Sequence, residues 1–268
     1  MKTVLAAIDT NLTAGPVLAT ASALARLLGA EVQPVHVRVE TQPGARVVVE
    51  AAGLDLTELS GDPVEALVDA VSAGEAAAIV LGVRATPGGR RPAGGTALAV
   101  AARAPKPVVL VPPDAPRAGR LERVLVPLEG SIASAHAPRS VIELAAGAHV
   151  DVVVLHVLEE AALPAFTDQP QHETHAWAQE FLARYCPWAA KAVRFEWRVG
   201  RCDEMIAAAV EETNVDLVAM GWAQDLATGR APVVRSVLAR AHVPVLLLPV
   251  IVNSPTNMPE RLLVFNAA

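Results

Sequence analysis

Aromatic residues and cysteines are scarce in this chain of 268 residues. Aromatic side chains make up 3% of the sequence, and the only two cysteines are Cys186 and Cys202. Two thiols do not make a disulfide framework in a chain of this size, so we expect both to be reduced and partly buried. Hydrophobic residues still account for 53% of the sequence. Because Ala, Val and Leu supply most of them, the composition is typical of parallel sheets covered by Ala-rich helices.

The sequence also lacks a long apolar run and an excess of positive charge. No apolar stretch approaches the ~20 residues of a membrane helix. The short apolar run at the N-terminus ends at Asp9 and predicts a strand instead of a signal peptide. We therefore expect a cytoplasmic protein with no membrane partner. The net charge is −6, whereas a duplex-binding protein needs a basic face, so we do not expect a nucleic-acid partner.

Five blocks of the first half of the sequence recur, in the same order, in the second half. The paired blocks are 3–9 with 123–129, 35–40 with 155–160, 61–71 with 200–210, 77–82 with 216–221, and 102–112 with 239–249. Ordered self-similarity of this kind predicts one domain duplicated in tandem. We place the boundaries at 1–112 for the first copy, 113–121 for a Pro-rich linker, 122–250 for the second copy and 251–268 for a tail, in which 262–265 is a candidate edge strand.

The pattern of apolar residues in each copy predicts alternating strands and helices. In copy one we expect strands at 3–8, 32–39, 54–59, 77–81 and 107–111, helices at 13–28, 63–72 and 96–103, and a short helix at 45–52. Asp62 and Pro63 suit the start of the second helix. Copy two has a longer middle, where Glu173–Tyr185 predicts a full helix. The predicted fold class is α/β: two tandem Rossmann- or flavodoxin-like domains, each with a five-stranded, mainly parallel sheet flanked by helices.

An acidic residue follows the first strand of both copies. Sheets of this class bind ligands at the carboxyl ends of their strands, near the point where the strand order reverses. Asp9 stands there in copy one, and Glu129, followed by Gly130 and Ser131, stands there in copy two. A carboxylate in this place can accept hydrogen bonds from a ribose or a base. Taken alone, either acid is equally typical of an ordinary helix cap.

The loop after the fourth strand of copy one, from Gly82 to Thr96, is rich in glycine. Its last two residues, Gly95 and Thr96, open a helix whose N–H groups and dipole favour an anion, and Thr96 adds a hydroxyl. The loop also carries three arginines, which suit phosphate: Arg84, Arg90 and Arg91. Taken alone, the same loop is also typical of a solvated segment that binds nothing.

Together these features resemble a tandem universal stress protein. Nucleotide-binding members of that family carry Gly, two residues, Gly, nine residues, then Gly and Ser or Thr after strand four. Gly82, Ala85, Gly95 and Thr96 stand at these spacings, with alanine in place of the second glycine. The family also has an acid after strand one and a His-Val pair late in strand two. The matching residues in the two copies are Asp9, His36 and Val37, and Glu129, His156 and Val157.

The resemblance implies an adenine nucleotide, ATP or AMP with or without Mg²⁺, held mainly by copy one. The residues it implies for this site are Ala7, Asp9, Val37, Gly82, Arg84, Ala85, Gly94, Gly95 and Thr96. Copy two has Gln224 in place of the second glycine and Ala231-Pro232 in place of Gly-Ser, and Pro232 has no N–H for a phosphate. We therefore expect a degenerate second site there. Its residues would be Pro127, Glu129, Ser131, Val157 and Gly221.

Three functions stay open at this point. The first is a stress-response regulator that holds the nucleotide, and the second is a nucleotide-independent scaffold for an unknown protein partner. The third is a slow ATP hydrolase, for which no general base is evident, so we assign no catalytic residue. By resemblance, the two copies pack about a pseudo-twofold axis through 107–111 and 244–249, and a homodimer of tandem chains stays open.

Three further sets of residues have ordinary explanations. His172 and His175 are three residues apart in a predicted helix, but no third ligand lies nearby in the sequence, so we assign no metal site. Trp222 falls in the site loop of copy two, where it either stacks on a base or, as we favour, packs within the protein or forms an exposed partner surface. His36 and His156 fall in predicted buried strands. We therefore expect them to be core or site-lining residues instead of catalytic bases.

Overall fold

The computed structural model describes residues 2–9, 11–38, 49–50, 52–83, 95–117, 119–130, 135–158, 170–187, 193–225, 227 and 230–250. The strands are β1 (Thr3–Ala7), β2 (Glu31–Val37), β3 (Thr57–Leu59), β4 (Ala76–Gly82), β5 (Val108–Val111), β6 (Arg123–Pro127), β7 (Asp151–Leu158), β8 (Val193–Val199), β9 (Leu217–Trp222) and β10 (Val245–Pro249). The helices are α1 (Asn11–Leu28), α3 (Pro63–Ser72), α4 (Gly95–Arg103), α6 (Arg139–Gly147), α7 (Pro170–Tyr185), α8 (Cys202–Thr213) and α9 (Pro232–Arg240). We call the part up to β5 domain 1 and the part from β6 domain 2.

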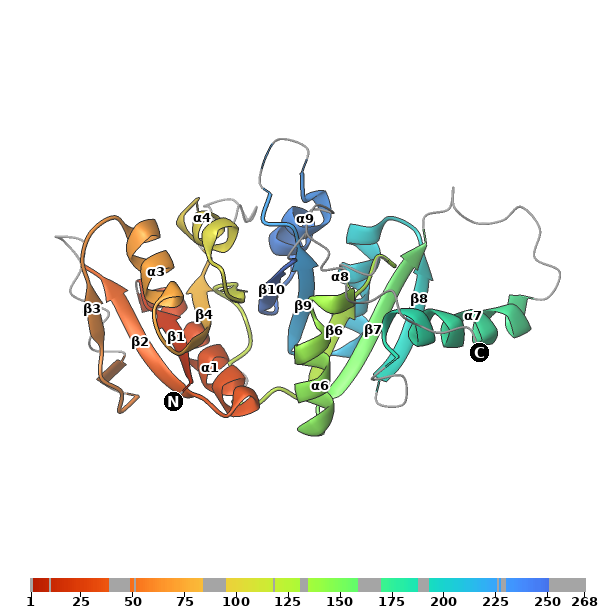
Figure 1. The fold of residues 1–268 in the computed structure, drawn as a ribbon, viewed down its shortest axis with the longest axis horizontal. Coiled ribbons are helices and arrows are strands. Elements are labelled where there is room, and N and C mark those ends of the chain that lie inside the picture. The colour runs from red at the N-terminus through yellow and green to blue at the C-terminus, as the bar shows by residue number, and fades with distance from the viewer. Residues whose placement is uncertain are drawn as a thin grey trace, which may run out of the picture.

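All ten strands belong to one sheet, in the order β3-β2-β1-β4-β5-β10-β9-β6-β7-β8. Neighbouring strands within each domain are parallel, whereas β5 and β10 are antiparallel, with Val109 opposite Leu246. Figure 1 shows the two domains side by side, with β10 at their junction. Equivalent strands stand at equal distances from this junction, so the domains are related by an approximate twofold axis through the β5–β10 pair. The predicted α/β class and its tandem arrangement are confirmed.

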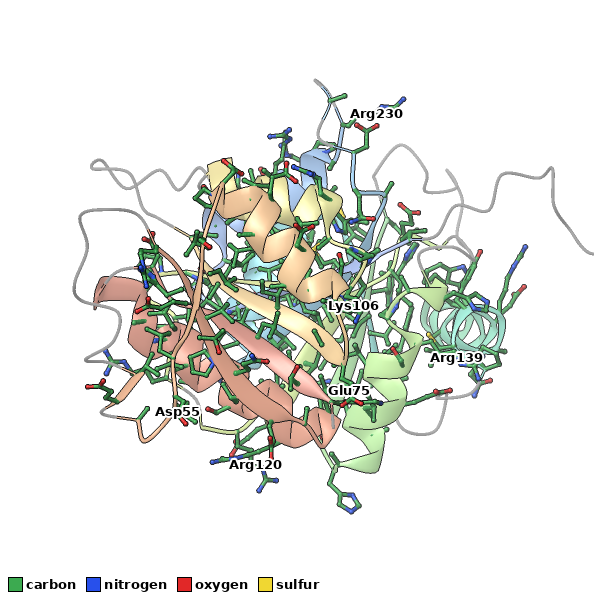
Figure 2. All side chains as sticks on the ribbon, turned by 60° about the vertical axis from the view of Figure 1, so that its left-hand side comes forward. Asp55, Glu75, Lys106, Arg120, Arg139 and Arg230 are labelled. Carbon is green, nitrogen blue, oxygen red and sulfur yellow. The ribbon has the colours of Figure 1, made fainter. Side chains whose placement is uncertain are left out.

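Helices cover both faces of the sheet. Buried side chains of α1, α6 and α7 pack on one face, and buried side chains of α3, α4, α8 and α9 pack on the other. The buried sheet residues are mainly Val, Leu, Ile and Ala, as expected when parallel strands are covered on both sides. Charged side chains such as Asp55, Arg120 and Arg230 lie at the periphery (Figure 2).

Local sequence signals account for several boundaries. The carboxylate of Asp62 accepts hydrogen bonds from the N–H groups of Val64 (2.9 Å) and Glu65 (3.1 Å), which caps α3 at its predicted start. The strand predicted at 54–59 is wrong in length, because β3 begins only at Thr57. The N–H of Leu54 donates to the carbonyl of Val49, so the chain is still in a turn there.

Other expectations are corrected or fall outside the described residues. The strand predicted at 32–39 ends at Val37, and the helix predicted from Glu173 already begins at Pro170, whose missing N–H is no loss in a first turn. Of the short helix at 45–52, Val49 and Glu50 are helical, and most of the remainder is not described. The candidate edge strand at 262–265 and the tail lie outside the described residues.

A hydrogen bond from α1 holds the linker, and the two cysteines differ in burial. The guanidinium of Arg26 on α1 donates to the carbonyl of Gly119, which holds the linker against domain 1. Neither cysteine forms a disulfide: Cys202 is half-buried and Cys186 is fully buried. Burial raises the pKa of the Cys186 thiol to about 11, so this thiol is inert at neutral pH.

None of the described helices combines the length and apolarity needed to cross a membrane.

The junction between the domains gives a first prediction. Leu247 lies in β10 opposite Val108 of β5 and has no exposed surface. Leu247→Ala should lower the free energy of unfolding by about 2–5 kcal/mol, because it leaves a cavity in a packed interior. Urea unfolding measures this change, with Leu144→Ala as the control. Leu144 is 40% exposed, and its substitution should change stability by less than ~0.5 kcal/mol. Equal effects of the two substitutions would contradict the packing of β10 against β5.

Candidate functional site

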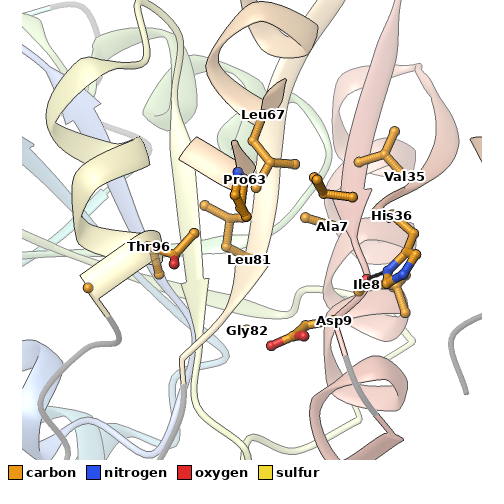
Figure 3. Close-up of a pocket in the computed structure, with 13 residues that line it drawn as sticks. Ala7, Ile8, Asp9, Val35, His36, Pro63, Leu67, Leu81, Gly82 and Thr96 are labelled. Atoms are coloured by element: carbon orange, nitrogen blue, oxygen red, sulfur yellow. Dashed lines mark hydrogen bonds between the residues drawn. The ribbon is translucent and has the colours of Figure 1, made fainter. Parts of the chain in front are cut away.

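A cavity of about 290 Å³ opens in domain 1 at the carboxyl ends of β1, β2 and β4 (Figure 3). β1 has β2 on one side and β4 on the other, so the strand order reverses at this place. Such switch points are where open α/β sheets bind their ligands. The first turns of α3 and α4 complete the wall. The volume is at the lower end of the range for small-molecule sites, which is roughly 300–1,000 Å³.

Six of the residues proposed from the sequence line this one cavity. They are Ala7, Asp9, Val37, Gly82, Gly95 and Thr96. Arg84, Ala85 and Gly94, which were proposed with them, lie outside the described residues. Pro63 and Leu67 of α3 also line the cavity and were missed. Their spacing of four residues places them on one face of a helix, which is the signal that would have found them.

The cavity has an apolar interior and polar groups at its rim. Val37, Leu67 and Leu81 are all at least nine-tenths buried and give an apolar wall. Asp9 and Thr96 are exposed at the mouth, and Figure 3 shows them on opposite sides of the cavity. An apolar slot with a few polar groups at its edge is the usual construction of a small-molecule site.

A histidine fixes the backbone just before the acid at the mouth. Nδ1 of His36 lies 2.7 Å from the carbonyl oxygen of Ile8, and because that oxygen only accepts, Nδ1 donates. The N–H of Ile8 donates in turn to the carbonyl of Val35 (2.9 Å). The backbone of Ile8, which precedes Asp9, is therefore held by β2 through both its N–H and its carbonyl. This bonding makes His36 a residue that positions the backbone at the cavity, as expected from its place in a strand.

Domain 2 repeats this backbone arrangement. Nδ1 of His156 donates to the carbonyl of Leu128 (2.7 Å), and the N–H of Leu128 donates to the carbonyl of Leu155 (2.8 Å). The duplicated fold thus places Glu129 as it places Asp9. The rest of the two sites differs.

The two glycines of the cavity are needed for different physical reasons. A Cβ atom built on Gly82 would lie 2.7 Å from both Cβ and Oγ1 of Thr13 on α1. Glycine at this position lets α1 pack closely on β4. The family resemblance had instead suggested that this glycine lets a phosphate approach the backbone. No atom of the described residues lies within 4 Å of a Cβ atom built on Gly95. The described part of the protein therefore leaves the start of α4 open, and the first N–H groups of this nine-residue helix have no partner within the helix.

An exposed ion pair joins α3 and α4, the two helices that flank the cavity. The guanidinium of Arg103 at the end of α4 donates to both carboxylate oxygens of Glu65 on α3, at 2.5 and 2.6 Å. The hydrogen bonds from Arg103 lower the pKa of Glu65 below its ordinary value. Both side chains are about half exposed, so the pair orients the two helices more than it stabilises the fold.

The corresponding place in domain 2 is built from different residues. Met220 stands where domain 1 has Leu81, and α9 begins at Pro232, after Ala231 at φ 49°. Proline has no N–H to donate to an anion. The start of α9 therefore lacks a hydrogen-bond donor that the start of α4 has. Trp222 is 4% exposed and packs in the core, which confirms the structural explanation of this residue.

The residues proposed for a degenerate second site come from several elements of domain 2. Pro127 ends β6, Val157 lies in β7 and Gly221 lies in β9, whereas Ser131 lies outside the described residues. Glu129 instead lines a cavity of about 230 Å³ beside α7, together with His156 and three aromatic residues. The aromatic residues are Trp177, Phe181 and Tyr185.

The aromatic residues of this second cavity pack chiefly on one another. The ring of Phe181 lies 4.6 Å from that of His156 and 4.7 Å from that of Tyr185, between ring centroids. Phe181 is 5% exposed, so α7 uses these rings to cover its face of the sheet. Among the described residues, no group of three or more His, Cys, Asp or Glu is placed to hold a metal ion. The side chains of His172 and His175 are not among them.

A duplicated, mainly parallel sheet covered by helices on both faces defines the structural class: a two-domain α/β protein. The model of the universal stress protein family matches residues 49–112 and 120–249. Since these segments cover more than half of the sequence, the chain belongs to the universal stress protein family. A comparison with proteins of curated function gives no match.

Solved structures agree in fold over almost the whole chain. A universal stress protein from Archaeoglobus fulgidus DSM 4304 is 18% identical, with a TM-score of 0.67, and the match covers 92% of this chain and 98% of that one. A functionally unknown protein from Pseudomonas aeruginosa PAO1 is 11% identical, with a TM-score of 0.64, covering 93% and 92%. A universal stress protein solved in complex with cAMP is 21% identical over 48% of this chain and 98% of its own, with a TM-score of 0.35.

The two cavity glycines should respond oppositely to a methyl group. Gly82→Ala should lower the free energy of unfolding by about 1–3 kcal/mol, because the new Cβ overlaps Thr13. Gly95→Ala should leave stability unchanged or raise it by up to ~1 kcal/mol, because the site is open and alanine favours the helix. Chemical unfolding of the two variants measures the difference. A destabilised Gly95→Ala beside an unaffected Gly82→Ala would show that α1 and α4 are placed wrongly.

Proposed function

We propose that this protein is a stress-response regulator that binds an adenine nucleotide, ATP or AMP, in the cavity of domain 1. The observation that carries the proposal is the combination, in one cavity, of an apolar wall, a carboxylate and an open helix N-terminus. A nucleotide needs a partner of each kind, for its base, its ribose and its phosphates. Domain 2 lacks this combination, because Pro232 begins the helix that would face the phosphates.

Each part of the nucleotide has a suitable partner at the cavity. The apolar side chains of Val37, Leu67 and Leu81 suit the faces of a purine ring. The carboxylate of Asp9, at the mouth, suits the ribose hydroxyls, which donate hydrogen bonds to it. The base would thus lie between β2, α3 and β4, and the ribose would lie at the end of β1.

The phosphates belong at the start of α4. Gly95 and Thr96 line the cavity there, and unpaired N–H groups together with the helix dipole favour an anion at a helix N-terminus. Thr96 adds a hydroxyl donor, and the sequence supplies Arg84, Ala85 and Gly94 in the loop that leads to it. Mg²⁺ would enter with the phosphates of ATP, since phosphate oxygens are its usual ligands.

Calorimetry with ATP and AMP tests the proposal. We expect one nucleotide per chain, with a dissociation constant of about 1–100 μM. Gly95→Trp should abolish binding by filling the cavity at the start of α4, because the position is open in the free protein. Ala231→Trp, at the equivalent position of domain 2, is the control and should bind as the unmodified protein does. Circular dichroism checks that both variants are folded.

The outcomes separate the three candidate functions. No heat change with the unmodified protein, and no nucleotide released when it is denatured, would reject nucleotide binding and favour the scaffold. Steady release of phosphate from ATP above background would favour the hydrolase.

The carboxylate at the mouth gives a second test. Asp9→Ala should weaken AMP binding roughly 10- to 100-fold, since a hydrogen bond to a charged group contributes about 1.5–3 kcal/mol. Glu129→Ala is the matched control, because Glu129 holds the equivalent place in domain 2 but lines a different cavity. It should change the affinity by less than about twofold. Equal losses for the two variants would place the ribose outside the domain 1 cavity.

A further inference from the structure

A glutamine of domain 2 reaches across to a helix of domain 1. Gln224 follows β9, in the loop that corresponds to the one between Gly82 and Thr96 in domain 1. Its side-chain Nε2 donates to the carbonyl of Ala101 (3.0 Å) and to the carbonyl of Ala104 (2.8 Å). Both acceptors lie at the carboxyl end of α4, and these bonds are partly buried.

A proline explains why these carbonyls need an outside donor. Within a helix, the carbonyl of Ala101 would accept the N–H of residue 105. That residue is Pro105, which has no N–H. Ala104 lies just past the end of α4, and Pro107, three residues further on, also lacks an N–H. The side-chain amide of Gln224 supplies the hydrogen bonds that the local sequence cannot.

The donor and the proline occur in different copies of the duplicated sequence. Pro105 of copy one corresponds to His242 of copy two, and Gln224 of copy two corresponds to Ala85 of copy one. In a dimer of identical chains, every subunit would carry both residues. In a tandem chain, the proline that leaves a carbonyl without a donor can lie in one domain, and the glutamine that donates to this carbonyl can lie in the other.

The backbone of Gln224 also indicates a specific role. It has φ 56°, a left-handed conformation that favours glycine, and it stands where nucleotide-binding relatives are expected to have one. Glutamine is disfavoured there unless its side chain compensates. Two hydrogen bonds to the end of α4 provide that compensation.

The helix that Gln224 holds is the one that lines the cavity. Gly95, Thr96 and Ala97 begin α4 at the cavity wall, and its other end meets Gln224. Since α4 is nine residues long and its Val100 and Ala101 are buried, a constraint at one end limits movement at the other.

We propose that Gln224 is a positioning residue for the domain 1 site: it fixes α4 so that the helix start meets the ligand. This inference rests on the proposed nucleotide site. Domain 2 thereby keeps a role in binding through the loop that no longer suits phosphate itself. By linkage, a nucleotide that orders the start of α4 strengthens the Gln224 contact to the same extent.

A double-mutant cycle between positions 224 and 105 tests the inference. Gln224→Met keeps the length of the side chain and removes the amide, and it should weaken AMP binding about tenfold. Pro105→Ala restores an N–H that can serve Ala101. In the Pro105→Ala background, Gln224→Met should therefore change the affinity by less than about twofold. Calorimetry gives the affinities, and urea unfolding gives the same cycle for stability.

A spectroscopic readout separates positioning from simple stabilisation. The side-chain amide resonances of Gln224 in a ¹⁵N-labelled protein should shift when AMP binds at the far end of α4. The control is Gln33, whose amide faces Thr57 on the outer strands and should not shift. Gln224→Gly, which relaxes the backbone as well as removing the amide, replaces Gln224→Met if that variant does not fold.

Each outcome bears on one claim. If AMP binds the unmodified protein and Gln224→Met equally well, the positioning role is rejected while the nucleotide site stands. The role is also rejected if Gln224→Met is equally harmful with and without Pro105. If AMP does not bind the unmodified protein, the proposed function fails. The stability cycle still tests whether Gln224 and Pro105 are coupled, and additive effects there would reject the contact itself.

Discussion

The antiparallel pairing of β5 with β10 determines how the two domains of this protein meet. It joins two parallel sheets into one and reverses the strand direction at the junction. The carboxyl edge of the domain 2 strands therefore lies beside the amino edge of the domain 1 strands. Because α4 runs antiparallel to its strand, the loop after β9 meets the end of α4 instead of its start. The cavity of one domain and the corresponding loop of the other are thus placed at opposite ends of a single helix.

This geometry explains how two copies of one fold came to do different things. Both copies keep the backbone bonds that fix the end of their first strand, through His36 and His156. Only domain 1 keeps an open helix start beside a cavity, whereas Pro232 closes that possibility in domain 2. The domain 2 loop instead contributes Gln224 to α4. Duplication within one chain permits this division, since each copy is free to lose what the other retains.

Much of this arrangement was predictable from local sequence. Asp62 and Pro63 mark the start of α3, and the family resemblance identified six of the cavity residues at the ends of β1, β2 and β4 and at the start of α4. The reason for Gly82 was not predictable, because its contact with Thr13 depends on how α1 packs on β4. The bond from Gln224 to Ala101 joins residues 123 positions apart. Pro105 is visible in the sequence, but only the antiparallel junction shows which side chain serves the carbonyl it leaves unpaired.

Hydrogen–deuterium exchange with and without AMP tests the central claim, that one chain holds one nucleotide site supported by both domains. AMP should slow exchange at the end of β1, at both ends of α4 and in the loop at 223–225. Exchange at the start of α9 should stay unchanged. Equal protection at the starts of α4 and α9, or protection confined to domain 2, would contradict it.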